Sequence, residues 1–255
     1  MRLARLAVVP VVLFSVACFQ GQRVIKVNAD GSGSVVDTVK LTAQAKSMLD
    51  GMDQMDSSSP AEKKAKKDAK LKALAVAMGE GVTFVKAEPT TDGGERLTWS
   101  FKDVSKLKLE TSPTMSAAET KSSGEPLTFR FARSGASSLL TVVVAPPKPK
   151  DPAQQPKKST PEEEAQGMAM MKGMLAGLKM TTAVEVNGKL VKTSSPYAAG
   201  STVTLLEIDF DQIDEAGLKK LSAADPSTPP TPDMLKGVKG IKASMGEVTI
   251  EFAGK

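Results

Sequence analysis

Five methionines gather in one stretch of the chain, and their sulfur atoms could do chemistry. They are Met168, Met170, Met171, Met174 and Met180. Thioether sulfur is a soft ligand that suits Cu(I), so one hypothesis is a copper site. A second is a surface for lipid or another apolar ligand, because methionine side chains adapt to varied partners. The third is core packing of a helix, because four apolar side chains share one of its faces: Met168, Met171, Leu175 and Leu178.

The remaining reactive residue types exclude most catalytic chemistry. The chain has no histidine and a single cysteine, Cys18, which rules out Ser-His-Asp and Cys-His pairs, histidine ligands and an internal disulfide. The missing histidine also weakens the copper hypothesis. Four carboxylates lie close together but lack the glycine-bearing loop of a calcium site: Asp209, Asp211, Asp214 and Glu215. With no phosphate loop or nucleophile elbow, the sequence predicts a protein that is not an enzyme and holds no metal or cofactor.

The cysteine stands at the end of an export signal. Arg2 and Arg5 precede an apolar run over residues 6–14, which is too short to span a bilayer. The motif Ser15-Val16-Ala17-Cys18 resembles the lipobox of bacterial lipoproteins, in which the cysteine is acylated and becomes the mature N-terminus. The resemblance implies a signal peptide over 1–17, acylation (for example by palmitate) at Cys18, and stable anchoring by two or more acyl chains. The alternative is an ordinary signal peptide cleaved after Ala17.

The charge balance argues against nucleic acid as a partner. The chain has 34 basic and 29 acidic residues, and removal of Arg2 and Arg5 leaves 32 against 29, a net charge of +3. Such a small excess makes no concentrated basic patch. Aromatic residues make up only 4% of the chain, which leaves few platforms for base stacking.

Local patterns predict the elements that must position these residues. Apolar runs at 24–27 and 35–41 flank a turn rich in Gly and Asp, which indicates a hairpin directly after the anchor. Ser59-Pro60 opens a helix over 61–78 whose first half is crowded with lysines. Because Asp56, Glu62 and Asp68 dilute that charge, we expect a solvated helix face; the alternative is contact with anionic lipid headgroups.

Later segments continue the strand pattern. Alternation predicts strands at 82–87, 97–101, 127–131, 139–144, 181–186, 202–208 and 248–252, and Asn187-Gly188 is the strongest hairpin signal in the chain. Trp99, in one of these runs, is expected in the core. The alternating run that begins at Leu97 has a counterpart at Leu206, so a duplication is one interpretation of the two halves. Residues 146–164 are rich in proline and predict a linker or long loop.

Together these patterns favour an α+β fold of antiparallel β-meander sheets, with helices packed on one face and a Pro-rich interruption. The expected division is an N-terminal α+β region over 18–145, the linker over 146–164, and a C-terminal α+β region over 165–255, which could form one composite domain with the first. The order of elements, from Val24-Ile25-Lys26-Val27 to Val248-x-Ile250-x-Phe252, resembles uncharacterised bacterial lipoproteins such as the LppM-like group. That resemblance implies a role in the cell envelope and carries over no site residue.

The sequence therefore predicts a non-catalytic lipoprotein of the cell envelope with a structural or interaction role. Phe19 after the cysteine favours the outer membrane, facing the periplasm, over the extracytoplasmic face of the cell membrane. The expected partners are the membrane, reached through the anchor, and an envelope protein or lipid. The alternative function is a carrier of lipid or another apolar ligand. A hollow between a sheet and the methionine-rich helix would favour the carrier, and a filled core would argue against it.

Overall fold

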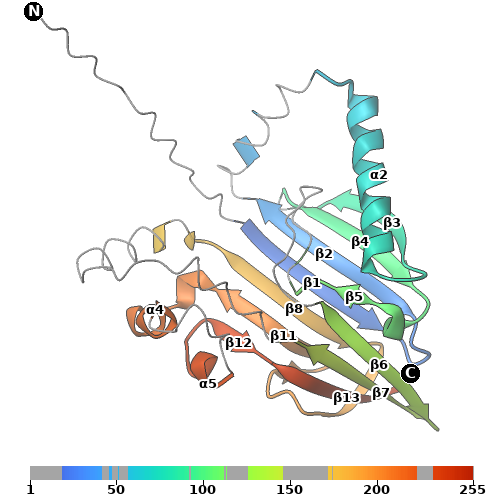
Figure 1. The fold of residues 1–255 in the computed structure, drawn as a ribbon, viewed down its shortest axis with the longest axis vertical. Helices are drawn as coiled ribbons and strands as arrows, with labels where there is room; N and C mark the ends of the chain where they lie inside the picture. The colour runs from blue at the N-terminus through green and yellow to red at the C-terminus, as the bar shows by residue number, and fades with distance from the viewer. Residues whose placement is uncertain are drawn as a thin grey trace, which may run out of the picture.

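Two β-sheets packed face to face make up most of the molecule (Figure 1). The structure, a computed structural model, describes residues 19–41, 46–47, 51, 57–91, 93–111, 113, 126–145, 172–173, 175–222 and 232–254. Cys18, Met168, Met171 and the Pro-rich segment 146–164 therefore lie outside the described residues.

The larger sheet has eight strands. Its order is β10 (Ala198–Ala199), β11 (Thr202–Asp209), β8 (Lys179–Val186), β1 (Phe19–Val27), β2 (Gly33–Leu41), β4 (Glu95–Phe101) and β3 (Thr83–Pro89), and β12 (Ile241–Ala243) also pairs with β11. The pairing of β1 with β8 is parallel, and the other described pairings of this sheet are antiparallel. The predicted hairpin is confirmed as β1 and β2, with Val24 opposite Val36.

The smaller sheet has five strands and is antiparallel throughout. Its order is β5 (Lys108–Leu109), β6 (Leu127–Ser134), β7 (Ser137–Val144), β13 (Gly246–Gly254) and β9 (Gly188–Thr193). Both sheets combine strands that precede the Pro-rich segment with strands that follow it: β8 lies beside β1, and β13 lies beside β7.

Helix α2 (Pro60–Met78) is the longest helix described, and it lies against the β3 and β5 region. Its start is confirmed by a capping box, in which Ser59 Oγ accepts from the Glu62 N–H and the Glu62 carboxylate accepts from the Ser59 N–H. Three side chains in its second half are buried: Leu71, Ala75 and Met78. The short 3-10 helices η1 (Val104–Lys106) and η3 (Phe210–Gln212) follow β4 and β11.

Two further helices lie apart from the main core. Helices α4 (Glu215–Ser222) and α5 (Pro232–Leu235) belong to a region with its own small buried cluster, made of Ile213, Leu218 and Val238. The 3-10 turn of η3 precedes α4 in the chain.

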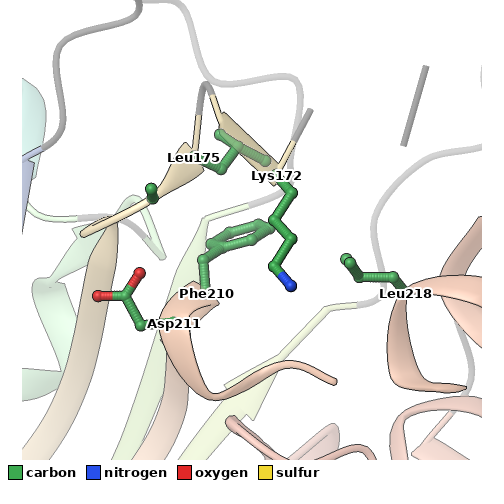
Figure 2. A pocket seen from close by; sticks show the side chains of 6 residues that line it. Lys172, Leu175, Phe210, Asp211 and Leu218 are labelled. Atoms are coloured by element: carbon green, nitrogen blue, oxygen red, sulfur yellow. The ribbon is translucent and has the colours of Figure 1, made fainter. Parts of the chain in front are cut away.

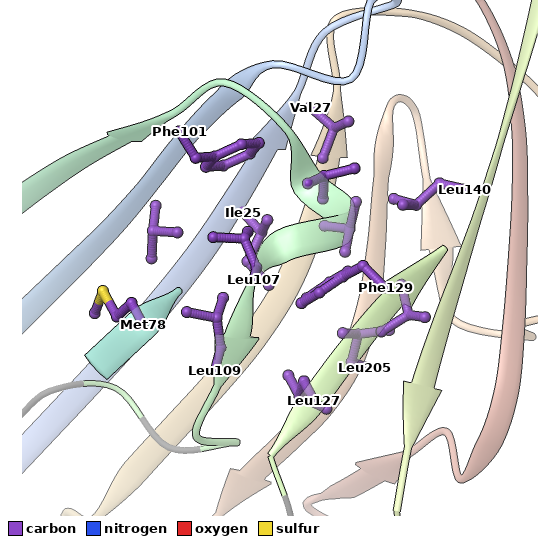
Figure 3. Packing of buried hydrophobic residues seen from close by; sticks show 14 of the residues in the cluster. Ile25, Val27, Met78, Phe101, Leu107, Leu109, Leu127, Phe129, Leu140 and Leu205 are labelled. Carbon is purple, nitrogen blue, oxygen red and sulfur yellow. The ribbon is translucent and has the colours of Figure 1, made fainter. Parts of the chain in front are cut away.

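The main core lies between the sheets and is filled by alternating side chains of both (Figure 3). Ile25, Leu205, Phe129 and Leu140 are among its fully or almost fully buried members. Trp99 is also completely buried, which confirms its predicted place, and its ring packs at a tilt on Phe84 with centroids 6.1 Å apart. At about 25 cal/mol per Å² of apolar surface removed from water, such a core is the main stabilising contribution to the fold.

The predicted α+β arrangement, with helices covering one face of meander sheets, is wrong, because the chain is mostly β. The second sheet, rather than a layer of helices, covers the apolar face of the first, and α2 extends that second layer only beside β5. Alternation shows that one face of a strand is buried but does not show what buries it. Helical cover and sheet cover leave the same pattern in a strand.

Asn187-Gly188 is also not the hairpin turn that its sequence predicts. The chain passes there from β8 in the larger sheet to β9 in the smaller one, and β9 pairs with β13. The Asn187 N–H donates to the Val27 carbonyl over 2.8 Å. A Cβ at Gly188 would lie 2.0 Å from the Ala253 carbonyl oxygen, so glycine serves a close approach of backbones.

Candidate functional site

The end of the larger sheet next to Cys18 is the first candidate region. Strand β1 begins at Phe19, the residue after the predicted site of acylation. Phe19 pairs with Leu41 at the end of β2, and Gln20 pairs with Lys179 at the start of β8. We call this edge, where β1 and β8 begin and β2 ends, the anchor end. No linker of irregular chain separates the cysteine from the fold.

The N-terminal turns of helix α2 lie toward the same end of the molecule (Figure 1). An ion pair joins Lys67 to Glu95, the first residue of β4. Glu95 pairs with Val39, which is two residues from the Leu41–Phe19 pair at the anchor end. The first turns of α2, before Lys67, therefore lie close to the level at which the anchor would enter the fold.

A buried ion pair lies inside the sandwich near this end. The Arg23 guanidinium donates from Nε and Nη2 to the two carboxylate oxygens of Asp37 over 2.8 and 2.6 Å, and from Nη1 to the Glu110 carbonyl over 2.6 Å. The two side chains are 2% and 0% exposed. On the neighbouring strand, the Thr182 hydroxyl donates to the Thr111 carbonyl. These polar side chains tie the segment after β5 to the inner face of the larger sheet.

This cluster suits a structural role better than chemistry. The charge of Arg23 faces the charge of Asp37 in a bidentate pair, and both groups are already hydrogen-bonded. Sequence reasoning missed it, although a signal existed. In the predicted hairpin, residues whose numbers sum to 60 lie opposite each other, which places Arg23 across from Asp37, and both interrupt alternating apolar runs.

The methionine-rich segment is described only from Lys172 onward. Leu175 and Leu178 are half-buried, and neither belongs to the buried clusters. Leu175 lines a small pocket of about 100 Å³ with Lys172, Phe210 and Leu218 (Figure 2). Beside it, Asp211 accepts a hydrogen bond from the Gly177 N–H over 2.7 Å. Met168, Met170, Met171 and Met174 lie outside the described residues, and the three hypotheses stay predictions.

A larger groove of about 540 Å³ lies at the opposite end of the larger sheet, where β1 ends. Its lining is mainly polar and includes Lys26, Ser34 and Glu185. Lys26 and Glu185 form an exposed ion pair with nitrogen and oxygen 3.4 Å apart. An exposed ion pair of this kind contributes little to the stability of the fold.

The predicted acidic cluster is split by the fold. Asp209 is nearly buried and accepts from Lys179 and Gln212, whereas Asp211, Asp214 and Glu215 are exposed. Burial raises the pKa of Asp209, but the Lys179 ammonium and the Gln212 amide outweigh burial and hold it below its ordinary value. The hydrogen bond to Asp209 in turn raises the pKa of Lys179. Among the described residues, no group of three or more acidic or cysteine side chains is placed to hold a metal ion.

Comparison with known protein families and with curated protein sequences finds no match. Among solved structures, the chain is similar to the folded domain of the Mycobacterium tuberculosis LppM protein, determined by NMR. The match covers 93% of this chain and 90% of that one, with 10% identity and a TM-score of 0.28. At this level of similarity no residue role is carried over. In the described part of the chain, no helix is long and apolar enough to cross a membrane.

Proposed function

We propose that this chain is a non-catalytic envelope lipoprotein that is anchored through Cys18 and holds its β-sandwich close to the membrane as an interaction module. The observation that carries the proposal is the start of β1 at Phe19. An acylated Cys18 would be joined directly to a central strand, which pairs with β2 on one side and β8 on the other. The lipobox-like motif supplies the chemistry of attachment.

Metabolic labelling with radioactive palmitate tests the anchor. We expect the full chain, produced in a bacterium that makes lipoproteins, to incorporate the label and to stay with the membrane fraction after a high-salt wash. Cys18→Ser should lose the label and the membrane association. Phe19→Ala is the matched control, because it changes the neighbouring residue and keeps the thiol. Label that persists in Cys18→Ser, or its absence from the wild type, would overturn the proposal.

The carrier alternative is not supported by the described residues. A pocket for a small-molecule ligand usually has a volume of about 300–1,000 Å³ and a mainly apolar lining. The pocket beside Leu175 has about 100 Å³, and the larger groove has a mainly polar lining. Between the two sheets, buried side chains from both occupy the interior. Most of the methionine-rich helix, beside which a hollow would favour a carrier, lies outside the described residues.

A further inference from the structure

The first two turns of α2 bury no side chain. Buried residues of the helix begin at Leu71, whereas residues 60–67 are exposed or at most half-buried. An amphipathic helix normally packs one stripe along its whole length. Here the stripe is confined to the second half, so the first half projects beyond the sheet that supports the second. We call residues Pro60–Lys66 the overhang.

The overhang reaches the level of the anchor. Its seven residues, which precede the Lys67–Glu95 ion pair, rise about 10 Å along the helix axis. The two-residue step from Val39, the partner of Glu95, to Leu41 spans about 7 Å. The overhang and Phe19 are therefore both at the anchor end, and a membrane that holds Cys18 would lie within reach of the overhang.

Half of the net charge of helix α2 lies in the overhang. Helix α2 has six lysines and two acidic residues, a net charge of +4, and no basic residue in its last turn. Three of the lysines, Lys63, Lys64 and Lys66, are in the overhang, where the only acidic side chain is Glu62, held in the capping box. Lysines near a helix N-terminus oppose the helix dipole, and Lys63 and Lys67 repel each other at i,i+4 spacing. Lys66, by contrast, donates to the Ser58 hydroxyl over 2.8 Å, so the overhang lysines do not all act against the helix.

We propose that the overhang contacts anionic phospholipid headgroups of the membrane to which the chain is anchored. This proposal rests on the proposed anchoring through Cys18. Lipid anchors commonly act together with a basic patch, because the two signals add their free energies of membrane binding. The negative surface of a membrane attracts lysines that lie within a Debye length of it. The exposed Lys64 and Lys66 and the half-buried Lys63 at the anchor end have the charge complementarity and the position that such contact requires.

Vesicle binding tests the contact without the anchor. The assay uses residues 18–255 with Cys18→Ser, which retain every described element and carry no acyl chain. We expect cosedimentation with vesicles of phosphatidylcholine and phosphatidylglycerol, loss of binding at high salt, and little binding to pure phosphatidylcholine. Each lysine near a membrane surface strengthens binding about fivefold. The triple variant K63Q/K64Q/K66Q should therefore bind on the order of a hundredfold more weakly.

The matched control removes three exposed lysines from the opposite end of the sandwich: Lys102, Lys106 and Lys189. K102Q/K106Q/K189Q has the same net charge as the overhang variant and should bind nearly as well as the parent. Equal loss in both variants would show an attraction of the whole charge and would overturn the proposal. No binding by the parent would overturn it too, and would leave the overhang to an acidic protein or to solvent.

A footprint on the lipidated full chain separates this proposal from the anchor proposal. In vesicles containing phosphatidylglycerol, an amine-reactive reagent should label Lys63, Lys64 and Lys66 more weakly than in detergent, whereas Lys102 and Lys106 should react equally in both. Protection of neither group, in a chain that incorporates palmitate, would contradict the headgroup contact alone. Failure of palmitate incorporation would contradict the anchor, whatever the vesicle assay shows.

Discussion

Breaking the buried ion pair should destabilise the fold more than removing it. In Asp37→Asn, the Arg23 guanidinium stays in the core with a neutral partner, although both side chains are almost fully buried. Loss of one partner of a buried pair costs about 3–5 kcal/mol of unfolding free energy. R23M/D37L removes both charges together, and the loss of the donor to the Glu110 carbonyl costs about 1–3 kcal/mol. We expect the double variant to be about 2 kcal/mol more stable than Asp37→Asn.

Urea unfolding measures these differences, because Trp99 is the only tryptophan and its side chain is completely buried. Its fluorescence should follow one cooperative transition at neutral pH. The control is R130Q/E247Q, which removes an ion pair whose side chains are 66% and 55% exposed and should change the unfolding free energy by about 1 kcal/mol or less. A loss below about 1 kcal/mol in Asp37→Asn, or a double variant less stable than the single one, would refute the reasoning.

Three further substitutions test local features. Gly31→Ala in the β1–β2 turn places a side chain at a φ of 86° and 2.9 Å from the Phe131 ring; we expect a loss of about 1–3 kcal/mol in the same urea assay, and an unchanged midpoint would contradict the turn geometry. In Gly188→Ala the new Cβ would lie 2.0 Å from the Ala253 carbonyl oxygen. We expect the free energy of unfolding to fall by at least as much, about 1–3 kcal/mol. Asp209→Asn should cost about 1 kcal/mol or less at neutral pH, because its partner Lys179 is 44% exposed. Since the pKa of Asp209 is lowered in the fold, that difference should disappear as the pH falls below 3.8; a difference that persists at lower pH would argue against the ion pair as its source.

Local structure could be predicted from the sequence wherever short-range chemistry decides it. The hairpin follows from two alternating runs and a turn in which Asp30 accepts from Ser32 and Gly31 takes a positive φ. The start of α2 follows from Ser59, Pro60 and Glu62 in the order that a capping box requires. The hydrogen bonds that set these two features join residues close together in the chain, so residue types and spacing suffice.

Long-range pairing could not be predicted in the same way. Nothing in the composition of β8 distinguishes a parallel partner of β1 from a hairpin partner of β9, and the Asn187-Gly188 pair favoured the second. The suggested duplication meets a similar difficulty. Leu97 and Trp99 are buried, whereas Leu206 is only partly buried, because a bulge between Thr204 and Leu206 shifts the phase of β11.

The candidate site also combines features that are local in the sequence with features that depend on long-range contacts. Cys18 is predicted as an acylation site from a local motif, and the lysines of α2 form a charge run in the sequence, but the position of these lysines relative to the cysteine depends on tertiary structure. The sequence alone favours a solvated helix face, because it does not show which way the helix runs relative to the cysteine. The ion pair between Lys67 and Glu95, and the register from Glu95 through Val39 to the start of β1, place the run at the anchor end.

Because β1 begins at Phe19, directly after Cys18, an acyl anchor would be joined to the sheet without a flexible tether. A flexible tether would let the sandwich rotate freely, and the local concentration of lysines at the membrane would fall as the tether lengthened. Strand β1 instead begins at Phe19 and pairs on both sides from Gln20 to Val27. An acylated Cys18 would then restrain the direction of β1 and, through the sheet, of α2. Under that restraint the overhang would stay near the headgroups, and the polar groove where β1 ends would lie on the side of the sandwich away from the membrane.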